Sequence, residues 1–173
     1  MEQNDNSKNS SIEMKKYELI PSDMPKLYRV RALRDFAHVI KGDVGGYIES
    51  EGNLSHDGNA WVHGNARVYG DACVSGNARV SGNARVYGDA CVSGNALVYG
   101  DAQVSSVKDY IVFKNWWTSG RFFTWTRSND MWTVGCFYGT GRQLIDKAYE
   151  DSMLSGREYA RIVEYVDKIK EYL

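Results

Sequence analysis

The chain has 173 residues, of which 43% are hydrophobic and 25% are charged, and these are the proportions of a folded globular protein. Its formal net charge of -1 excludes a bulk electrostatic attraction to nucleic acid or to an anionic membrane. The three cysteines are too few for a disulfide framework and no apolar run has membrane-spanning length, so we expect a soluble protein of a reducing compartment.

The first fifty residues divide into a polar tail and a small β unit. Residues 1–16 are rich in Asn, Ser, Lys and Glu, and we expect them to form a disordered tail. Alternation of polar and apolar residues predicts strands at 16–20 and 26–36, separated by Pro21 and Pro25. We interpret residues 17–50 as an N-terminal β cap.

A hexapeptide repeat follows, in which Gly-Asn-Ala or Gly-Asp-Ala returns eight times between Gly58 and Ala102. In the unit Ala-x-Val-x-Gly-Asn/Asp, Ala and Val face one side of a strand and the two x residues face the other. Gly followed by Asn or Asp tolerates the left-handed backbone of a corner. Such short strands bury their Val residues only if the chain coils and successive turns stack in parallel.

The stretch GNARVYGDACVSGNA resembles the hexapeptide repeat of left-handed parallel β-helices, with an aliphatic residue followed four positions later by a small one, as in Val68 and Ala72. In that family three hexapeptides make one triangular coil. The resemblance implies a mainly β fold, namely a short left-handed parallel β-helix of about three coils over residues 51–105, and it implies a trimer. The ALRDF and GGYIE stretches before the repeat and the Trp-rich segment after it also resemble uncharacterised phage and prophage hexapeptide-repeat proteins. That resemblance implies the cytoplasm of a bacterial host cell.

Residues 106–173 predict a Trp-rich α+β domain that caps the C-terminal end of the coils. Three strands are expected at 110–114, 121–127 and 131–137. Two helices are expected to begin at the capping boxes Thr140–Gln143 and Ser155–Glu158. The second helix carries an apolar stripe that we expect to pack on this sheet: Tyr159, Ile162, Val166, Ile169 and Leu173. The tryptophans are expected to fill this small core, and the alternative is that Trp116 and Trp117 are exposed binding anchors.

An enzyme must be considered, because hexapeptide β-helices include acyltransferases with a histidine base and zinc carbonic anhydrases with three converging histidines. The chain has His38, His56 and His63, and neither His56 nor His63 has an Asp partner visible in the sequence. We interpret the histidines as surface residues and predict no catalytic residue, no metal site and no cofactor. The alternative is an acyltransferase-like enzyme with a site between subunits.

The variable x residues carry the functional signal, because residues 18 apart stack into columns on three faces of the coil. The first face carries Trp61, Arg79 and Leu97 beside His63, Ser81 and Tyr99. The second carries Arg67, Arg85 and Gln103 beside Tyr69, Tyr87 and Ser105. The third carries Cys73 and Cys91 beside Ser75 and Ser93. The third face is small and flat, so we expect it to pack on the C-terminal cap or between subunits, with its two thiols buried or interface-facing.

Arg and Tyr are enriched at binding hot spots, so we predict that Arg67, Tyr69, Arg85 and Tyr87 bind a partner. An equally weighted alternative is that Asp71 and Asp89 neutralise the two arginines. Secondary candidates are Trp61, Tyr99, Trp116 and Trp117. The sequence thus favours a non-catalytic protein-binding or scaffold module, for example a phage accessory protein that inhibits a host defence system. The expected partner is another protein or further copies of the chain, without membrane or nucleic acid, and pure self-assembly is the remaining alternative.

Overall fold

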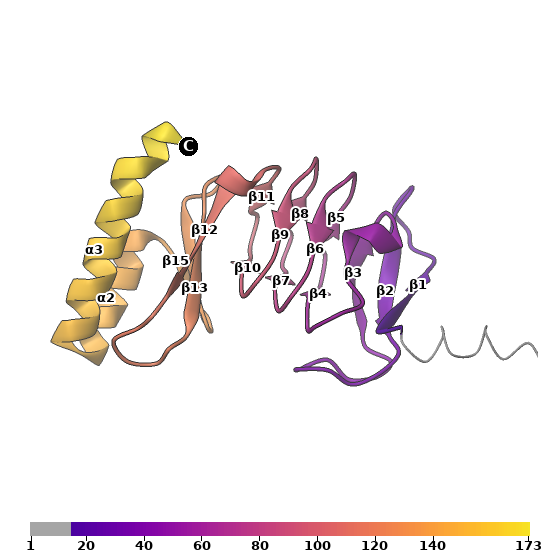
Figure 1. The fold of residues 1–173 in the computed structure, drawn as a ribbon, viewed down its shortest axis with the longest axis horizontal. Coiled ribbons are helices and arrows are strands. Elements are labelled where there is room, and N and C mark those ends of the chain that lie inside the picture. Colours follow the sequence, from indigo (N-terminus) through magenta and orange to yellow (C-terminus); the bar gives the residue numbers. More distant parts are fainter. Residues whose placement is uncertain (1–14) are drawn as a thin grey trace, which may run out of the picture.

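The computed structural model describes residues 15–173, an elongated molecule in which a cap, a stack of coils and an α+β domain follow one another along the long axis (Figure 1). Residues 1–14 of the tail predicted for residues 1–16 lie outside the described residues. Lys15 and Lys16, its last two residues, belong to the folded part. Lys16 is buried, and its ammonium group donates a hydrogen bond of 2.8 Å to the Ala60 carbonyl.

The N-terminal cap is an antiparallel meander of β1 (Tyr17–Ile20), β2 (Tyr28–Ala32) and β3 (Val44–Ile48). Strand β3 then pairs in parallel with β5 (Arg67–Val68) of the first coil. The cap and one face of the coil therefore form a single six-stranded sheet in the order β1-β2-β3-β5-β8-β11.

The repeat folds into a β-solenoid of about three coils built from two-residue strands, which confirms the predicted repeat fold. Besides β5, the strands are β4 (Trp61–Val62), β6 (Cys73–Val74), β7 (Arg79–Val80), β8 (Arg85–Val86), β9 (Cys91–Val92), β10 (Leu97–Val98) and β11 (Gln103–Val104). Residues 18 apart are partners in parallel ladders, as Arg67 and Arg85 show. The left-handed sense of the coil stays a prediction from the resemblance.

The core of the solenoid is a narrow column of the Val and Ala side chains from each hexapeptide. Every one of them between Ala60 and Val104 is at most 1% exposed. Burial of each Val side chain contributes roughly 1.5–3 kcal/mol, whereas Ala leaves the room that a tight triangular corner needs. One repeated pattern thus supplies both the stability and the shape of the coil.

The N-terminal edge of the coils is covered by hydrogen-bond donors of the cap, as an open sheet edge requires. The Tyr47 amide donates to the Ala66 carbonyl at 2.9 Å. Just before the first clean hexapeptide, the short 3-10 helix η1 (Glu51–Asn53) places the Asn53 amide group against the Gly70 and Ala72 carbonyls, at 2.9 and 2.8 Å. These contacts pair carbonyl groups that the first coil would otherwise present to solvent.

The C-terminal edge is covered by side-chain acceptors of the following domain. The Leu97 amide donates to the Thr124 hydroxyl at 2.9 Å, and the Gln103 amide donates to the Ser128 hydroxyl at 2.7 Å. The last coil also ends in the 3-10 helix η2 (Val107–Asp109), which leads into the C-terminal sheet. Both ends of the solenoid are therefore closed within the chain.

The C-terminal domain is an antiparallel meander of β12 (Tyr110–Lys114), β13 (Phe122–Thr126), β14 (Met131–Val134) and β15 (Phe137–Gly139). The sheet lies between the coils and two helices, α2 (Gly141–Asp151) and α3 (Met153–Ile169), and the 3-10 turn η3 (Lys170–Tyr172) follows (Figure 1). Strand β15 was not predicted. Gly135, with φ +58°, turns the chain inside the expected 131–137 strand and divides it in two.

The two helix starts compare differently with the prediction. Thr140 caps α2 through the expected capping box with Gln143. The predicted cap at Ser155 is wrong, because the cap of α3 is Ser152, three residues earlier, whose hydroxyl accepts from the Ser155 amide. The apolar stripe of α3 packs on the sheet as expected, with Tyr159 and Val166 in the core beside the fully buried Trp125 and Trp132. None of the helices in the described residues has the length and apolar character of a membrane span.

Candidate functional site

The second face of the solenoid presents a ladder of Arg67, Tyr69, Arg85 and Tyr87, which we call the Arg–Tyr surface. Val68 and Val86 point into the core, so the residues on either side of each must point outward. Arg67 and Arg85 are register partners on β5 and β8. The rings of Tyr69 and Tyr87 are stacked, with centroids 5.5 Å apart and planes 9° from parallel.

The charges of the two arginines of the Arg–Tyr surface have no direct partner in the described part of the chain. Within residues 15–173, neither guanidinium group forms an ion pair or a side-chain hydrogen bond. In particular, neither Asp71 nor Asp89 forms an ion pair with them, so the alternative that these carboxylates neutralise the arginines has no support from direct pairing. Two guanidinium groups one coil apart can together receive carboxylate or phosphate oxygens in bidentate contacts.

At the N-terminal end of the same sheet, the charged side chains are engaged in contacts within the fold. The Arg29 guanidinium lies 4.7 Å from the centroid of the Tyr47 ring and donates to the Gly45 carbonyl at 2.7 Å. The Glu49 carboxylate accepts from the Gly70 amide at 2.7 Å. These groups are engaged within the fold, whereas Arg67 and Arg85, further along the same sheet, are available.

Trp61 is not an exposed anchor, and this part of the prediction is corrected. Its side chain does leave the coil outward, but it is only 1% exposed. Phe36, from the loop between β2 and β3, packs edge-on against its ring at 5.3 Å, and Tyr17 lies edge-on at 6.2 Å. The hexapeptide pattern gives the outward direction correctly, but it carries no information about a loop that folds back over that face.

The other secondary candidates separate into exposed and structural residues. The side chain of Trp116 is 73% exposed and that of Tyr99 is 43% exposed. The ring of Tyr99 also makes an edge contact with the ring of Tyr138. Trp117 is partly buried in the C-terminal core, with its indole N–H donating to the Ser155 hydroxyl at 3.3 Å. Trp116 alone of the adjacent pair therefore offers a free aromatic surface.

His38 and His63 meet at a hollow of about 240 Å³ on the first face, which the sequence did not reveal. His38 comes from the β2–β3 loop and His63 follows β4, and Trp61 and Arg79 are among the other lining residues. Burial, aided by the charge of Arg79, lowers the pKa of His63, so the neutral imidazole is favoured. Among residues 15–173 no carboxylate hydrogen-bonds to His63, and it therefore lacks the orienting partner of a general base.

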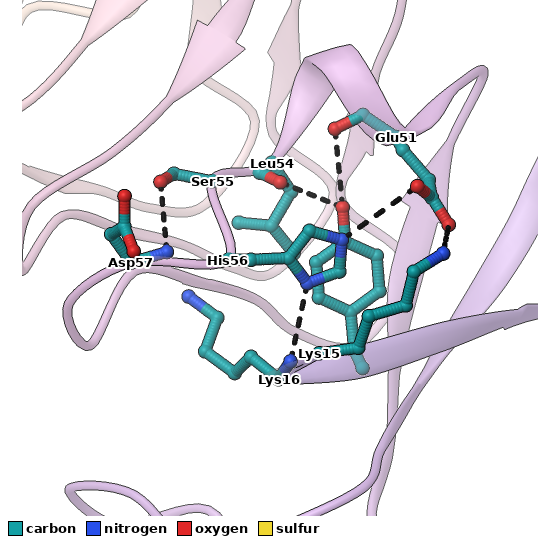
Figure 2. A network of polar contacts seen from close by, with 8 residues as sticks. Lys15, Lys16, Glu51, Leu54, Ser55, His56 and Asp57 are labelled. Carbon is teal, nitrogen blue, oxygen red and sulfur yellow. Dashed lines mark hydrogen bonds and ion pairs between the residues drawn. The ribbon is translucent and has the colours of Figure 1, made fainter. Parts of the chain in front are cut away.

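His56 is a structural residue rather than a surface one (Figure 2). Its Nδ1 accepts from the Lys16 amide at 3.2 Å, its ring stacks on Tyr17 at 4.2 Å, and its Nε2 lies 3.8 Å from the Glu51 carboxylate. Burial lowers the pKa of His56, and the positive charges of Lys15 and Lys16 act in the same direction. The neutral imidazole thereby joins the first strand of the cap to the first coil.

A further hollow of about 310 Å³ lies between the sheet and helices of the C-terminal domain. Its floor includes the buried side chains of Asn115, Ser155 and Tyr159, and Arg121 and Lys147 are also among its lining residues. Burial raises the pKa of Tyr159, which keeps its hydroxyl protonated and able to donate. No sequence pattern predicts this hollow, because its lining residues come from loops, from β14 and β15 and from both helices.

No metal centre is evident in the part of the chain that the structure describes. Within residues 15–173, three or more His, Cys, Asp or Glu side chains do not gather anywhere in an arrangement that could hold an ion. The candidate sites in these residues are the Arg–Tyr surface, the hollow at His38 and His63, and the hollow in the C-terminal domain.

Comparison with known protein families finds a match for the coils of the solenoid. A family model described as the YdcK beta solenoid repeat matches residues 66–82, 72–88, 78–94 and 90–106, which together run from β5 to the end of β11. No curated protein sequence matches the chain. Fold and comparison agree on a repeat β-solenoid protein, and neither identifies a substrate or a partner.

Proposed function

We propose that this protein is a non-catalytic binding module whose solenoid presents the Arg–Tyr surface to another protein. The observation that carries the proposal is the pair of in-register arginines without an ion partner in the described chain. Stacked like charges are destabilising by some tenths of a kcal/mol when exposed, so stability alone does not account for them. A partner that supplies the opposite charge accounts for both arginines at once.

The chemistry of the Arg–Tyr surface specifies an acidic partner. The guanidinium groups give bidentate contacts to carboxylate or phosphate groups, and the stacked Tyr69 and Tyr87 rings add flat area with little side-chain entropy to lose. The parallel ladder fixes the backbone of all four residues before the partner arrives, and the stacking of the two tyrosine rings adds to this order, which lowers the entropic cost of binding. The surface therefore suits a protein whose docking face is rich in Asp and Glu.

The finer form of the proposal is a phage or prophage accessory protein that docks on a host protein in the bacterial cytoplasm. An inhibitor of a host defence system is a concrete example. Its support is the resemblance of the whole layout, from the ALRDF and GGYIE stretches to the Trp-rich domain, to proteins encoded by phages.

An acyltransferase with a site between subunits is the second candidate, and the His38–His63 hollow is the observation that favours it. Release of thiol from an acyl-coenzyme A donor, lost on His63→Asn, would support the enzyme. Pure self-assembly is the third candidate. It predicts that the protein sediments as an oligomer and retains no other protein from a lysate.

The test is capture from a bacterial lysate with three immobilised baits: wild type, Arg67→Glu with Arg85→Glu, and Arg142→Glu with Arg157→Glu. Both variants change the net charge equally, but the control arginines lie on the helices and are exposed. The mass of the free protein is measured beside them. We expect one protein to be retained by wild type and by the control and lost from the Arg67/Arg85 variant. Retention on all three baits would place the site elsewhere.

A further inference from the structure

The third face of the solenoid carries two thiols in direct register. Cys73 on β6 and Cys91 on β9 are Cα partners in the parallel ladder, and both occupy outward x positions. Their Sγ atoms approach to 2.6 Å. Cys91 is exposed and Cys73 is half-buried, so the C-terminal domain does not cover the two thiols. Of the two expectations for this face, packing on the C-terminal cap is not found, and packing between subunits stays a prediction.

We propose that Cys73 and Cys91 form a thiol–disulfide modification site, which a small disulfide oxidant such as oxidised glutathione converts into a covalent link between successive coils. Paired strands are about 4.8 Å apart, which lies inside the Cα separation of about 4.4–6.8 Å that a disulfide spans. The backbone therefore need not move for the bond to form.

The ladder holds this register firmly. The Cys73 amide donates to the Ala90 carbonyl at 2.9 Å, and the Ser75 amide donates to the Val92 carbonyl at 3.0 Å. On the other side, the Tyr110 hydroxyl donates to the Cys91 carbonyl at 2.9 Å and fixes this strand from the C-terminal domain. Two side chains on neighbouring rungs of a fixed ladder cannot slide out of reach of each other.

The two cysteines differ in exposure, which orders the reaction. Cys91 is the more exposed and meets the oxidant first. Burial and the neighbouring Cys91 thiol raise the pKa of Cys73 to about 11, so Cys73 holds its proton near neutral pH. Cys73 therefore acts second, as the resolving thiol.

The chemistry balances in two exchanges. The Cys91 thiolate attacks one sulfur of oxidised glutathione, a mixed disulfide forms, and one glutathione leaves as the thiolate. Cys73 then gives up its proton and attacks the Cys91 sulfur, the Cys73–Cys91 bond forms, and the second glutathione leaves. Two protein thiols are oxidised, one glutathione disulfide is reduced to two thiols, and the two thiol protons end on the glutathiones. Excess reduced glutathione reverses both steps.

The link closes a ring of one coil and restricts the unfolded chain. For a loop of this length the entropic stabilisation corresponds to a rise in Tm of roughly 6–12 °C. The rise in Tm should disappear when a reductant is added, because reduction breaks the Cys73–Cys91 bond and restores the two thiols.

Thiol counting tests the proposal directly. The reduced protein, unfolded, offers three thiols, Cys73, Cys91 and Cys136. Cys136 is exposed as well, so the test uses the Cys136→Ser background, in which Cys73 and Cys91 are the thiols that can react. After incubation with oxidised glutathione we expect this protein to show no titratable thiol, a mass lower by two hydrogens and no attached glutathione. Cys73→Ser in the same background should instead keep a glutathione on Cys91, because the resolving thiol is gone.

Three outcomes would overturn the proposal. A Cys136→Ser protein that keeps both of its thiols has no reactive pair, and one that keeps a stable glutathione adduct has no resolving cysteine. A covalent dimer of Cys136→Ser on a non-reducing gel would show that the thiols of different molecules meet instead.

Discussion

At the scale of single residues, the corners of the solenoid depend on how closely successive coils approach. Gly82 and Gly94 occupy the same position of their hexapeptides, at two different corners of the coil, with φ of +72° and +65°. A Cβ at Gly82 would lie 2.9 Å from the Gly100 nitrogen, whereas a Cβ at Gly94 would have no neighbour within 4 Å. Both positions need a left-handed backbone, but only Gly82 also needs the absence of a side chain.

We predict that Gly82→Ala destabilises the protein more than Gly94→Ala. The second change costs about 1 kcal/mol for the left-handed backbone, and the first adds a backbone clash of roughly 1–3 kcal/mol. Denaturant unfolding of the two variants measures the difference. Equal unfolding free energies would contradict the close stacking of the coils at this corner.

His56 makes the N-terminal cap sensitive to acid. Its Nδ1 accepts a hydrogen bond from the Lys16 amide, and protonation would replace this acceptor with a donor. The fold lowers the pKa of His56, so the unfolded chain binds the proton more tightly than the folded chain. The stabilisation is therefore complete above the ordinary histidine pKa of 6.5 and is lost as the pH falls below it.

We predict that the unfolding free energy of wild type decreases between pH 7 and about pH 5 more steeply than that of His56→Asn. Asn keeps an acceptor near the position of Nδ1 but does not titrate. His63, whose pKa is also lowered, contributes equally to both proteins and cancels. Parallel pH profiles of wild type and variant would contradict the role of His56.

At the scale of secondary-structure elements, the C-terminal sheet matters as a cover for the last coil. Thr124 on β13 is fully buried, and its hydroxyl accepts from the Leu97 amide. Its cross-strand partner Thr133 is also buried, but its hydroxyl makes no hydrogen bond within residues 15–173. The two threonines therefore form a matched pair for testing this contact.

We predict that Thr124→Val costs about 1–3 kcal/mol of unfolding free energy, because it leaves a buried amide without an acceptor. Thr133→Val should cost less than about 1 kcal/mol, because it removes no hydrogen bond. Thermal unfolding of both variants provides the comparison. A Thr124→Val protein as stable as Thr133→Val would show that the sheet does not cap the coil through this contact.

Elements were predictable where a local pattern decides them. The hexapeptide fixes a strand and a corner within six residues, and the Thr140 capping box fixes the start of α2. The start of α3 was misplaced because Ser152 and Ser155 both precede the helical segment and both carry a hydroxyl that can cap it. In the structure the earlier one, Ser152, is the N-cap. Strand β15 was missed because a single glycine decides whether 131–137 continues or turns.

At the scale of the whole molecule, the order of the coils made the Arg–Tyr surface predictable. The 18-residue register places Arg67 beside Arg85 without any knowledge of the caps. The burial of Trp61 and the hollows at His63 and Tyr159 were not predictable, because loops and helices far away in the sequence form their walls. The proposed partner site thus belongs to the part of the molecule that depends least on tertiary detail.

The affinity of the captured partner for Arg67→Ser with Arg85→Ser tests the central claim most directly. Arg142→Ser with Arg157→Ser is the control, because it removes the same charge from the exposed surface of the helices. With Tm unchanged in both variants, we predict at least about a thirtyfold loss for the Arg67/Arg85 variant, equivalent to about 2 kcal/mol, and less than about threefold for the control. Unchanged affinity of a stable Arg67/Arg85 variant would contradict the Arg–Tyr surface as the partner site.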